Sequence, residues 1–472
     1  MAEKKFFYIT TTIPYVNAEP HIGFALELIQ ADAIARFKRL LGKDVFFSTG
    51  TDEYGQKIWE ASQKESKDTQ DYVDYYAERY LELKKRLNLS YDNFIRTTSG
   101  GHILAAQEFW KLCDKKGDIY KKNYKGLYCV GCEKFLNEKD LLNGRCVLHP
   151  SLVPEVVEEE NYFFKLSNYK EKLLEYLSRE KVVFPEWRRK EAVEYVQGAM
   201  DDFSISRSKE RVLWGVPIPG DETQVMYVWF GAFVNYISTL GWPKDKEIFK
   251  KFWEEGETVQ TAGKDMVKFQ SIMWQGMLMS AGLSTTDHIM YHGFITGNGG
   301  VRMSKSLGNV INPKDVAEEY GADALRFFLL REVSTFDDSP FSIERFNESY
   351  NANLANGLGN LTSRIMKLAE TNLDKPVEVN EDTHETLGKL MENFEIQKAM
   401  NHIWEEIGKL DSLIQESKPW ETKDQKTITE LVKKLAHIGF SLQAFMPETS
   451  NKILAAIKEN KLSEPLFPRK DA

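Results

Sequence analysis

Residues 11–24 read Thr-Thr-Ile-Pro-Tyr-Val-Asn-Ala-Glu-Pro-His-Ile-Gly-Phe, and this stretch decides the fold. It follows residues 6–10, an apolar, aromatic and β-branched run that predicts a buried strand. Two prolines and an asparagine then indicate a turn, and apolar residues recur at helical spacing over residues 24–37. We therefore predict a strand, a turn and a helix, with His21 in the turn and Gly23 just behind it. In an open parallel sheet, such a turn lies where ligands bind, and the helix start offers N–H groups to phosphate.

Length and composition bound the class of protein. The chain has 472 residues, of which 42% are hydrophobic and 28% charged, so it is long enough for about two to four globular domains. No apolar run approaches the roughly 20 residues that span a bilayer, and no signal-peptide core follows the first residues. We therefore expect a cytoplasmic protein without membrane contact. The net charge of −9 argues against a general polyanion binder but permits a nucleic acid on a local basic face.

The first part of the chain alternates predicted strands and helices. Strands are predicted over residues 6–10 and 44–49, and helices over residues 24–41, 69–87 and 101–115. This alternation is typical of βαβ units and a parallel sheet. Asp52 follows the second strand, so we expect it at the same sheet edge as His21.

A short cysteine-rich segment interrupts this pattern. Cys129 and Cys132 form a C-x-x-C motif, and Cys146 and His149 form a C-x-x-H motif. Thirteen residues separate Cys132 from Cys146. Three thiolates and one imidazole supply a tetrahedral set that suits zinc. A closed set of four ligands has no open position for a substrate, so we predict one structural Zn²⁺.

The chain after the cysteine-rich segment carries an aromatic helix face. Four residues recur there at i, i+3, i+4 and i+7, namely Trp229, Ala232, Phe233 and Tyr236. A strand is predicted over residues 258–264 and a helix over residues 265–281. Such a stripe is more often core than ligand pocket, so the pattern alone leaves both possibilities open.

Residues 288–312 predict a strand, a glycine-rich turn and a loop with two cations, Arg302 and Lys305. Cations neutralise phosphoryl charge, and the two serines beside Lys305 leave backbone N–H groups accessible, so the loop suits a triphosphate. The alternative is a solvated turn. A helix is predicted after this loop, and we expect Asp315 to help cap it. From about residue 350 the sequence predicts a helix bundle.

Taken together, these segments resemble a known enzyme family. Residues 20–24, Pro-His-Ile-Gly-Phe, resemble the His-Ile-Gly-His signature of class I aminoacyl-tRNA synthetases, and residues 302–306, Arg-Met-Ser-Lys-Ser, resemble Lys-Met-Ser-Lys-Ser. The zinc knuckle stands between the two sheet halves, as in the methionyl-tRNA synthetases of that class. Neither a P-loop nor a dinucleotide glycine motif is visible. The resemblance covers nearly the whole chain.

The resemblance implies a fold and a division of the chain. The fold is α/β: a class I Rossmann-like parallel-sheet catalytic domain with an inserted zinc-knuckle connective domain, followed by an all-α anticodon-binding helix bundle. The expected segments are a first catalytic half at 1–115, the insertion at 116–222, a second catalytic half at 223–300, a loop and stem-contact region at 301–350, and the bundle at 351–472.

The resemblance also implies a two-step reaction. Methionine and ATP with Mg²⁺ give methionyl adenylate and pyrophosphate, and the adenylate then acylates the 3′ end of a methionine tRNA. The substrate brings its own nucleophile, so the protein needs only to align the reactants and stabilise phosphate charge. The residues implied as catalytic are His21, Arg302 and Lys305. The residues implied to bind ATP are His21, Gly23, His292, Gly293, Phe294 and Lys305.

Two binding sites follow from the same resemblance. Asp52 is implied to hold the methionine ammonium group, with Arg207 as a supporting charge. The implied side-chain pocket consists of Ile13, Tyr15, Trp229, Ala232, Phe233, Tyr236, Met266 and Gln270. The implied anticodon readers are Asn360, Arg364 and Trp420, because tryptophan stacks a base while the other two bind base edges; without the resemblance, Asn360 and Arg364 indicate a solvated helix face.

Some residues depart from the family pattern, and other functions stay open. Phe24 replaces the second histidine of the signature, Gln270 stands where a histidine is common, and Phe233 where a proline is common. One alternative is a synthetase of the same class for another amino acid such as cysteine. A second is a catalytically inactive, zinc-bearing RNA-binding relative, which Phe24 makes conceivable. A monomer is expected, since no dimerisation module is apparent.

Overall fold

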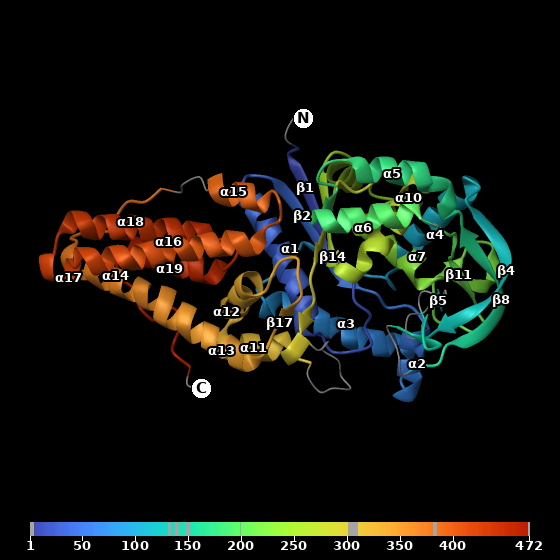
Figure 1. Cartoon of the computed structure of the whole chain (residues 1–472), viewed down its shortest axis with the longest axis horizontal. Coiled ribbons are helices and arrows are strands. Elements are labelled where there is room, and N and C mark those ends of the chain that lie inside the picture. Colours follow the sequence, from blue (N-terminus) through green and yellow to red (C-terminus); the bar gives the residue numbers. More distant parts are fainter. Residues whose placement is uncertain are drawn as a thin grey trace. The chain divides into compact units, whose positions relative to one another are not determined.

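The computed structural model describes residues 4–130, 134–136, 141–147, 152–198, 200–300, 310–380 and 385–470 (Figure 1). The chain forms two compact units. Unit 1 comprises residues 1–20, 44–82 and 91–291, and unit 2 comprises residues 21–43, 83–90 and 292–472. Within the described ranges, no helix combines the length and apolar character that crossing a membrane requires.

The main sheet of unit 1 has six strands in the order β3-β2-β1-β14-β15-β9. The strands are β1 (Phe6–Thr10), β2 (Asp44–Thr51), β3 (Asn93–Arg96), β14 (Glu257–Gly263), β15 (His288–His292) and β9 (Val183–Phe184). β1 runs parallel to both β2 and β14, β2 runs parallel to β3, and β15 to β9. The predicted parallel sheet is confirmed. β9 was not anticipated, because it lies inside the segment that the sequence assigns to the insertion.

Helices and short turns of unit 1 surround an aromatic core. The helices are α2 (Gln56–Lys64), α3 (Thr69–Arg86), α4 (Gly100–Lys115), α5 (Lys170–Ser178), α6 (Glu186–Gln197), α7 (Val228–Phe233), α8 (Asn235–Ser238), α9 (Lys246–Phe249) and α10 (Gln275–Ala281). The helix predicted over residues 265–281 is in fact three pieces: a 3-10 turn at Lys264–Met266, a π-helical segment at Phe269–Trp274, and α10. The wider π turn places Gln270 and Trp274 inside the core, where both are 0% exposed.

The insertion forms an antiparallel four-stranded sheet in the order β10-β8-β4-β5. Its strands are β4 (Ile119–Cys129), β5 (Lys134–Leu136), β8 (Glu155–Phe164) and β10 (Phe203–Ser204). Smaller sheets are β11 (Ser206–Ser208) with β13 (Asp221–Met226) and β12 (Pro217–Ile218), and β6 (Leu141–Leu142) with β7 (Arg145–Cys146). The change from parallel to antiparallel pairing marks where the main sheet is interrupted.

Unit 2 contains α1 and the helical C-terminal part. Its long helices are α1 (Ile22–Leu40), α14 (Asn360–Asn372), α16 (Ile396–Ser417), α18 (Gln425–Leu442) and α19 (Pro447–Glu459). Shorter elements are α11 (Pro313–Tyr320), α12 (Ala322–Phe327), α13 (Ile343–Ser349), α15 (Glu385–Met391), α17 (Pro419–Thr422), β16 (Ile295–Thr296) and β17 (Ser339–Pro340). The predicted helical C-terminal part is confirmed. The N-cap of α11 is Asn312, whose side chain accepts from the Lys314 N–H at 2.9 Å, and Asp315 lies in the first turn, where a negative charge favours the helix start.

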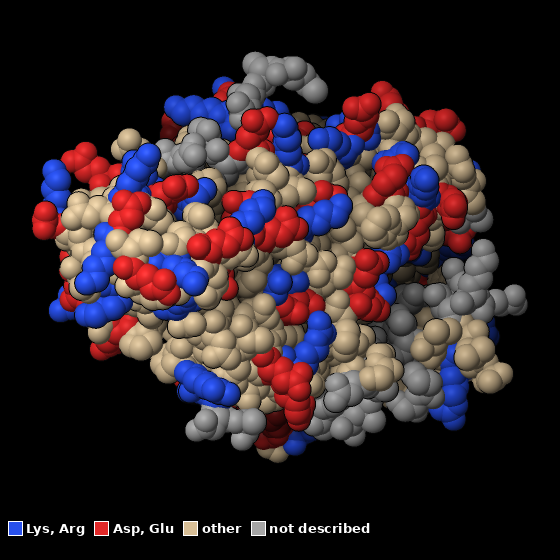
Figure 2. Space-filling model, turned by 60° about the vertical axis from the view of Figure 1, so that its left-hand side comes forward, with Lys and Arg blue, Asp and Glu red and all other residues tan. Residues whose placement is uncertain are grey.

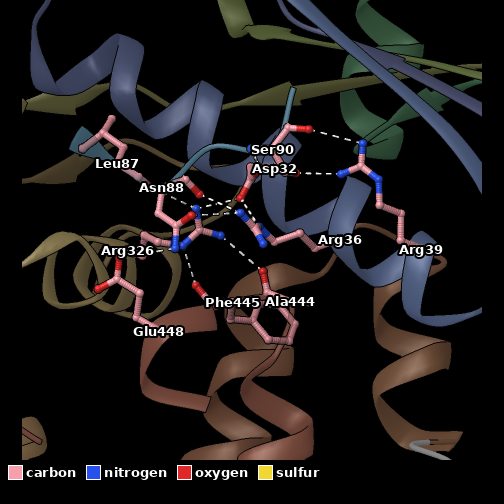
Figure 3. Close-up of polar contacts among 10 residues, drawn as sticks. All are labelled: Asp32, Arg36, Arg39, Leu87, Asn88, Ser90, Arg326, Ala444, Phe445 and Glu448. Atoms are coloured by element: carbon pink, nitrogen blue, oxygen red, sulfur yellow. Dashed lines mark hydrogen bonds and ion pairs between the residues drawn. The ribbon is translucent and has the colours of Figure 1, made fainter. Parts of the chain in front are cut away.

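A buried ion pair joins the elements of unit 2 (Figure 3). Arg326 of α12 and Asp32 of α1 are both fully buried, and Arg326 Nη1 lies 2.7 Å from Asp32 Oδ2. Arg326 also donates to the carbonyl oxygens of Phe445 at 2.7 Å and Ala444 at 3.2 Å, between α18 and α19. Asp32 accepts from the backbone and the hydroxyl of Ser90, each at 2.6 Å. One guanidinium group therefore connects α1, α12 and the bundle.

Candidate active site

His21 occupies the N-cap of α1, so the predicted strand, turn and helix are confirmed. Its Nδ1 accepts from the backbone N–H groups of Gly23 at 3.1 Å and Phe24 at 3.4 Å. In a neutral imidazole with Nδ1 as acceptor, Nε2 carries the proton and is a donor. A Cβ at Gly23 would lie 3.0 Å from His21 Nδ1, so glycine lets the imidazole fold back onto the helix start.

His292, at the end of β15, is anchored to α1 through Glu27, six residues after His21 in that helix. Its Nε2 lies 2.9 Å from Glu27 Oε2, and its Nδ1 lies 2.7 Å from the carbonyl oxygen of Gly293. Both ring nitrogens therefore lie within hydrogen-bond distance of oxygen atoms of the protein. Glu27 is a contact of His292 that sequence reasoning missed, although it lies only six residues after His21 in the chain.

The two residues that follow His292 are held by the chain at 337–338. A Cβ at Gly293 would lie 2.2 Å from the Asp337 carbonyl carbon. The Phe294 N–H donates to Asp338 Oδ1 at 2.9 Å. Gly293 is therefore required by close backbone packing, whether or not it also faces adenosine. The ATP-binding role of both residues stays a prediction.

Of the predicted phosphate loop, the structure describes only the residues at its two ends, up to residue 300 and from residue 310. Arg302 and Lys305 lie outside the described residues. The described chain resumes at residue 310, and the Ile311 carbonyl accepts from the Ile22 N–H at 2.9 Å. This hydrogen bond ties the backbone just after the loop to the first turn of α1, next to His21.

Asp52 lies beside Tyr15 at the end of β2. The two residues form a parallel bridge, and the Asp52 N–H donates to the Pro14 carbonyl at 2.9 Å. Asp52 is 6% exposed, and the Thr97 hydroxyl lies 3.4 Å from its Oδ1. A small cavity is lined by Asp52, Tyr227 and Ala232 among others. Asp52 is therefore paired with Tyr15 through the backbone and shares a small cavity with Ala232.

Phe233 and Tyr236 of the predicted pocket belong to one hydrophobic cluster of unit 1, against which Trp229 and Met266 pack. Trp229 stacks on Phe269 with ring centroids 4.3 Å apart, and Phe233 and Tyr236 lie 5.9 and 5.8 Å from Trp274. Gln270 Nε2 donates to the Tyr236 hydroxyl at 2.6 Å. Ile13 and Met266 are partly buried. Phe269 and Trp274 were missed, because the π-helical segment changes which residues share a face.

Arg207 on β11 is buried, with 3% of its surface exposed. Its Nη1 donates to Ser204 Oγ at 2.8 Å and to the Ser206 carbonyl at 2.6 Å. Its guanidinium carbon lies 4.1 Å from the centre of the Tyr227 ring. Tyr227 lines both the cavity that contains Arg207 and the small cavity that contains Asp52.

Two of the four predicted zinc ligands fall within the described residues. Cys129 and Cys146, with 1% and 2% exposure, share a small apolar cluster with Leu136. Cys132 and His149 lie outside the described residues. Among the residues that the structure does describe, no group of three or more potential ligands gathers. Two buried sulfur atoms from two hairpins fit a thiolate–zinc site, and the metal stays a prediction.

The predicted anticodon readers lie on helices of the bundle. Trp420 is 44% exposed, and the Arg364 guanidinium lies 5.9 Å from its ring. Arg364 Nη1 lies 3.1 Å from Asp411 Oδ1. With the Gln415 amide turned so that its oxygen faces Arg364, that oxygen accepts from Nη1 at 3.1 Å and from Nη2 at 3.0 Å. Asn360 is exposed at the start of α14. Asp411 and Gln415 were missed, because they lie on α16, far along the chain from Arg364 of α14, and only the tertiary structure brings these side chains together.

The distribution of charge on the face drawn in Figure 2 does not by itself indicate a nucleic-acid binding site. On the face drawn in Figure 2, basic side chains are interspersed with acidic ones. Recognition of a nucleic acid on this face would therefore depend on individual contacts, not on one broad positive field.

Comparison with known proteins shows close relatives over nearly the whole chain. The family model described as tRNA synthetases class I (M) matches residues 7–147 and 136–366. The methionine–tRNA ligase of Thermotoga maritima is 39% identical, with 96% of this chain and 75% of that protein covered. The methionine–tRNA ligase of Rhizobium meliloti is 38% identical, with 95% and 91% covered. The structure of Mycobacterium tuberculosis methionyl-tRNA synthetase in complex with methionyl-adenylate matches with a TM-score of 0.88 and 34% identity, covering 99% of each chain.

Proposed function

The chain belongs to the methionyl-tRNA synthetase family of class I, and from this premise we propose that it joins methionine to its tRNA. It activates L-methionine with ATP and transfers the methionyl group to the 3′ end of methionine tRNA. The observation that carries the proposal is the match of the whole chain, at 34% identity, to a structure holding methionyl-adenylate.

In the first step, a methionine carboxylate oxygen attacks the α-phosphorus of ATP, and pyrophosphate leaves with the electron pair of the broken P–O bond. His21 donates an N–H from Nε2 to a phosphate oxygen, since its Nδ1 is occupied by the helix start. Lys305 and Arg302 neutralise the developing phosphate charge, and Mg²⁺ accompanies the nucleotide. His292, Gly293 and Phe294 line the adenosine site.

Asp52 pairs with the methionine ammonium group, and Arg207 supports that end of the site. The aromatic cluster around Trp229 encloses the thioether, whose sulfur gains from contact with ring edges. Because ring contacts separate methionine from leucine only modestly, a polar contact to sulfur is needed. The Gln270–Tyr236 hydrogen bond of 2.6 Å fixes the tyrosine hydroxyl for that contact.

The zinc ion is structural in this proposal. Cys129, Cys132, Cys146 and His149 would hold it, and the bound ion would cross-link the two hairpins of the insertion. Elemental analysis of the purified chain is expected to give one zinc per molecule. A molecule purified without chelators that lacks zinc contradicts this part of the proposal.

Asn360, Arg364 and Trp420 read the anticodon. Asp411 and Gln415 hold the Arg364 fork next to the half-exposed Trp420 ring, so a base can stack on one while its edge meets the other. A cytoplasmic monomer is the state we propose for the enzyme.

The test is ATP–pyrophosphate exchange with each of the twenty amino acids, followed by charging of tRNA. Exchange that depends on methionine, with methionyl-tRNA as product, supports the proposal. Exchange with cysteine in place of methionine would assign a different synthetase of the same class. Tight tRNA binding without any adenylate would identify an inactive RNA-binding relative.

A further inference from the structure

Two acidic residues stand side by side where β2 ends, and the structure gives them different surroundings. Asp52 is the residue implied to hold the methionine ammonium group, and it lines the small cavity of unit 1 together with Tyr227 and Ala232. Glu53, the next residue, is fully buried. Because a buried carboxylate is costly unless other groups bind it, the contacts of Glu53 show what this second charge does.

The Glu53 carboxylate is bound by Arg96 of β3 through two parallel hydrogen bonds. Arg96 Nε lies 2.7 Å from Oε1, and Nη2 lies 2.9 Å from Oε2. The Thr51 hydroxyl donates to Oε1 at 2.6 Å, the Thr98 hydroxyl donates to Oε2, and Arg96 also donates to Asp74 of α3. Such a fork fixes a carboxylate in orientation as well as in position. The charge of Glu53 is therefore neutralised inside unit 1.

The backbone of these two acidic residues is held as well. The Asp52 N–H donates to the Pro14 carbonyl at 2.9 Å, and the Val16 N–H donates to the Asp52 carbonyl at 3.3 Å. The Glu53 carbonyl accepts from the indole N–H of Trp214 at 2.6 Å. With the backbone tied to two distant segments of the chain, rotation about the side-chain bonds is the main freedom that Asp52 keeps.

Thr97 restricts that remaining freedom. It follows β3 directly, it is buried, and it lines the small cavity together with Asp52. Its Oγ1 accepts from the Glu53 N–H at 2.8 Å, so the proton of the hydroxyl is directed to a second acceptor. That acceptor is Asp52 Oδ1 at 3.4 Å, a long contact whose main effect we expect to be on the orientation of the carboxylate.

The end of β3 supplies both contacts because of its register with β2. Arg96 stands opposite Thr51 in the parallel pairing, and the Thr97 N–H donates to the Thr51 carbonyl at 3.2 Å. Two adjacent residues of one strand end, Arg96 and Thr97, therefore bind the two adjacent acidic residues of the other. The bond from Arg96 keeps Glu53 in place, and the Glu53 N–H in turn sets the direction of the Thr97 hydroxyl.

We infer that Thr97 is a positioning residue for Asp52, and that the Glu53–Arg96 pair holds Thr97 and Asp52 in register. The inference rests on the proposed function, since it takes Asp52 as the partner of the amino-acid ammonium group. A carboxylate that is already oriented binds an ammonium group more tightly, because less side-chain freedom is lost on binding. Thr97 therefore affects binding of the amino acid and not binding of ATP.

The experiment measures the Kd of methionine for the full chain by isothermal titration calorimetry. Thr97→Val keeps the shape of the side chain but removes the hydroxyl, and it is expected to raise this Kd roughly 3- to 30-fold. Thr97→Ser restores the hydroxyl and is expected to bring the Kd back toward the wild-type value. Thr69→Val is the matched control, because it removes another buried hydroxyl of unit 1, bonded to Ser62 at 2.9 Å, and it is expected to bind methionine normally.

A methionine analogue without the amino group, 4-(methylthio)butanoate, separates positioning from a general effect on the fold. It keeps the carboxylate and the thioether but offers Asp52 no ammonium group. As a competitive inhibitor of ATP–pyrophosphate exchange, it is expected to have the same inhibition constant in the wild type and in Thr97→Val, because the lost contact is one that it does not use. The KM for ATP is likewise expected to stay constant.

Three results would each overturn the inference. They are an unchanged Kd for methionine in Thr97→Val, no recovery in Thr97→Ser, and equal weakening of methionine and of the analogue. Arg96→Lys is the second variant and serves also if Thr97→Val does not fold. It keeps the charge but not the two parallel hydrogen bonds, so it is expected to raise the Kd of methionine and to leave that of ATP unchanged. An unchanged Kd for methionine in Arg96→Lys contradicts the role of the pair.

Failure of the inference and failure of the proposed function are distinguishable. Every amino acid carries the ammonium group, so if the wild type activates cysteine in place of methionine, the same comparison is made with cysteine and the same result supports the inference. If the wild type activates methionine and both Thr97→Val and Arg96→Lys bind it normally, only the inference fails. A wild type that binds none of the amino acids contradicts both.

Discussion

Two buried arginines, one in each unit, have different environments. Arg326 in unit 2 is fully buried and paired with the equally buried Asp32 at 2.7 Å. Arg207 in unit 1 is 3% exposed and rests against the Tyr227 ring, a serine hydroxyl and a carbonyl oxygen. The first guanidinium is neutralised inside its unit and ties three elements together. The second lines an open cavity next to the predicted methionine site.

This comparison shows that burial alone does not distinguish a charged side chain with a structural role from one with a functional role. A buried arginine paired with a carboxylate stabilises only as part of the pair, since either charge alone is costly in a low-dielectric interior. A buried arginine that faces a cavity can meet a charge that a ligand brings. We therefore expect the same substitution to have different effects at the two positions.

Arg326→Met is expected to give the largest effect, a loss of about 3–5 kcal/mol in the free energy of unfolding, because it leaves Asp32 charged and unpaired. Urea unfolding followed by circular dichroism measures this loss. Arg36→Met is the control, since Arg36 also contacts Asp32 but is 20% exposed. A loss below about 1 kcal/mol in Arg326→Met would remove the contrast between the two arginines.

Arg207→Met is expected to affect activity more than stability. Removing a charged hydrogen-bonding group that supports the ligand should cost about 1.5–3 kcal/mol in kcat/KM for methionine, or roughly 10- to 150-fold. Exchange assays at varied methionine and ATP separate the two substrates, and KM for ATP is expected to stay constant. If the variant unfolds as readily as Arg326→Met, then Arg207 is structural.

Trp420→Ala tests a site of unit 2 that is exposed instead of buried. The change is expected to lower tRNA charging by about 1–3 kcal/mol in kcat/KM, the contribution of one base stack, and to leave adenylate formation untouched. Lys423→Ala, a nearby surface change after α17, is the control. Equal loss in exchange and in charging would indicate that Trp420 supports the fold.

The two units are also expected to lose stability in different pH ranges. Burial lowers the pKa of His102 in unit 1 from 6.5 to about 4. Between pH 6.5 and pH 4 the unfolded chain binds a proton at His102 and the folded chain does not. The free energy of unfolding therefore decreases as the pH is lowered from 6.5 to 4, by up to about 1.4 kcal/mol for each pH unit. His102→Gln is expected to remove this slope in urea midpoints.

Asp32 in unit 2 should respond only in stronger acid. Burial raises the pKa of its carboxyl, but the charges of Arg326 and Arg36 outweigh burial and hold it below 3.8. The carboxylate therefore stabilises the fold at every pH above 3.8, and its contribution is lost as pH falls further. If the free energy of unfolding of the His102→Gln variant still decreases as the pH is lowered from about 6, the two units do not respond in separate pH ranges.

Local sequence determined the elements around the site. Apolar periodicity and the prolines before His21 fixed β1, the turn and α1, because each signal acts over a few residues. Alternation of strands and helices fixed the parallel sheet, and with it the shared edge that holds Tyr15 and Asp52. The resemblance supplied Arg207 and Gln270, which no local pattern distinguishes from other polar residues. The predicted domain boundaries and the roles of the site residues stay predictions.

What the sequence by itself determined is therefore the order and type of elements and the position of His21 at a helix start, because these depend on neighbouring residues. Only the tertiary structure decided that Arg326 meets Asp32 and that Gln270 turns inward on a π-helical segment. Both features depend on contacts that the local sequence does not specify. Their stabilising free energy comes from burial and pairing of side chains, which arise only when each unit folds.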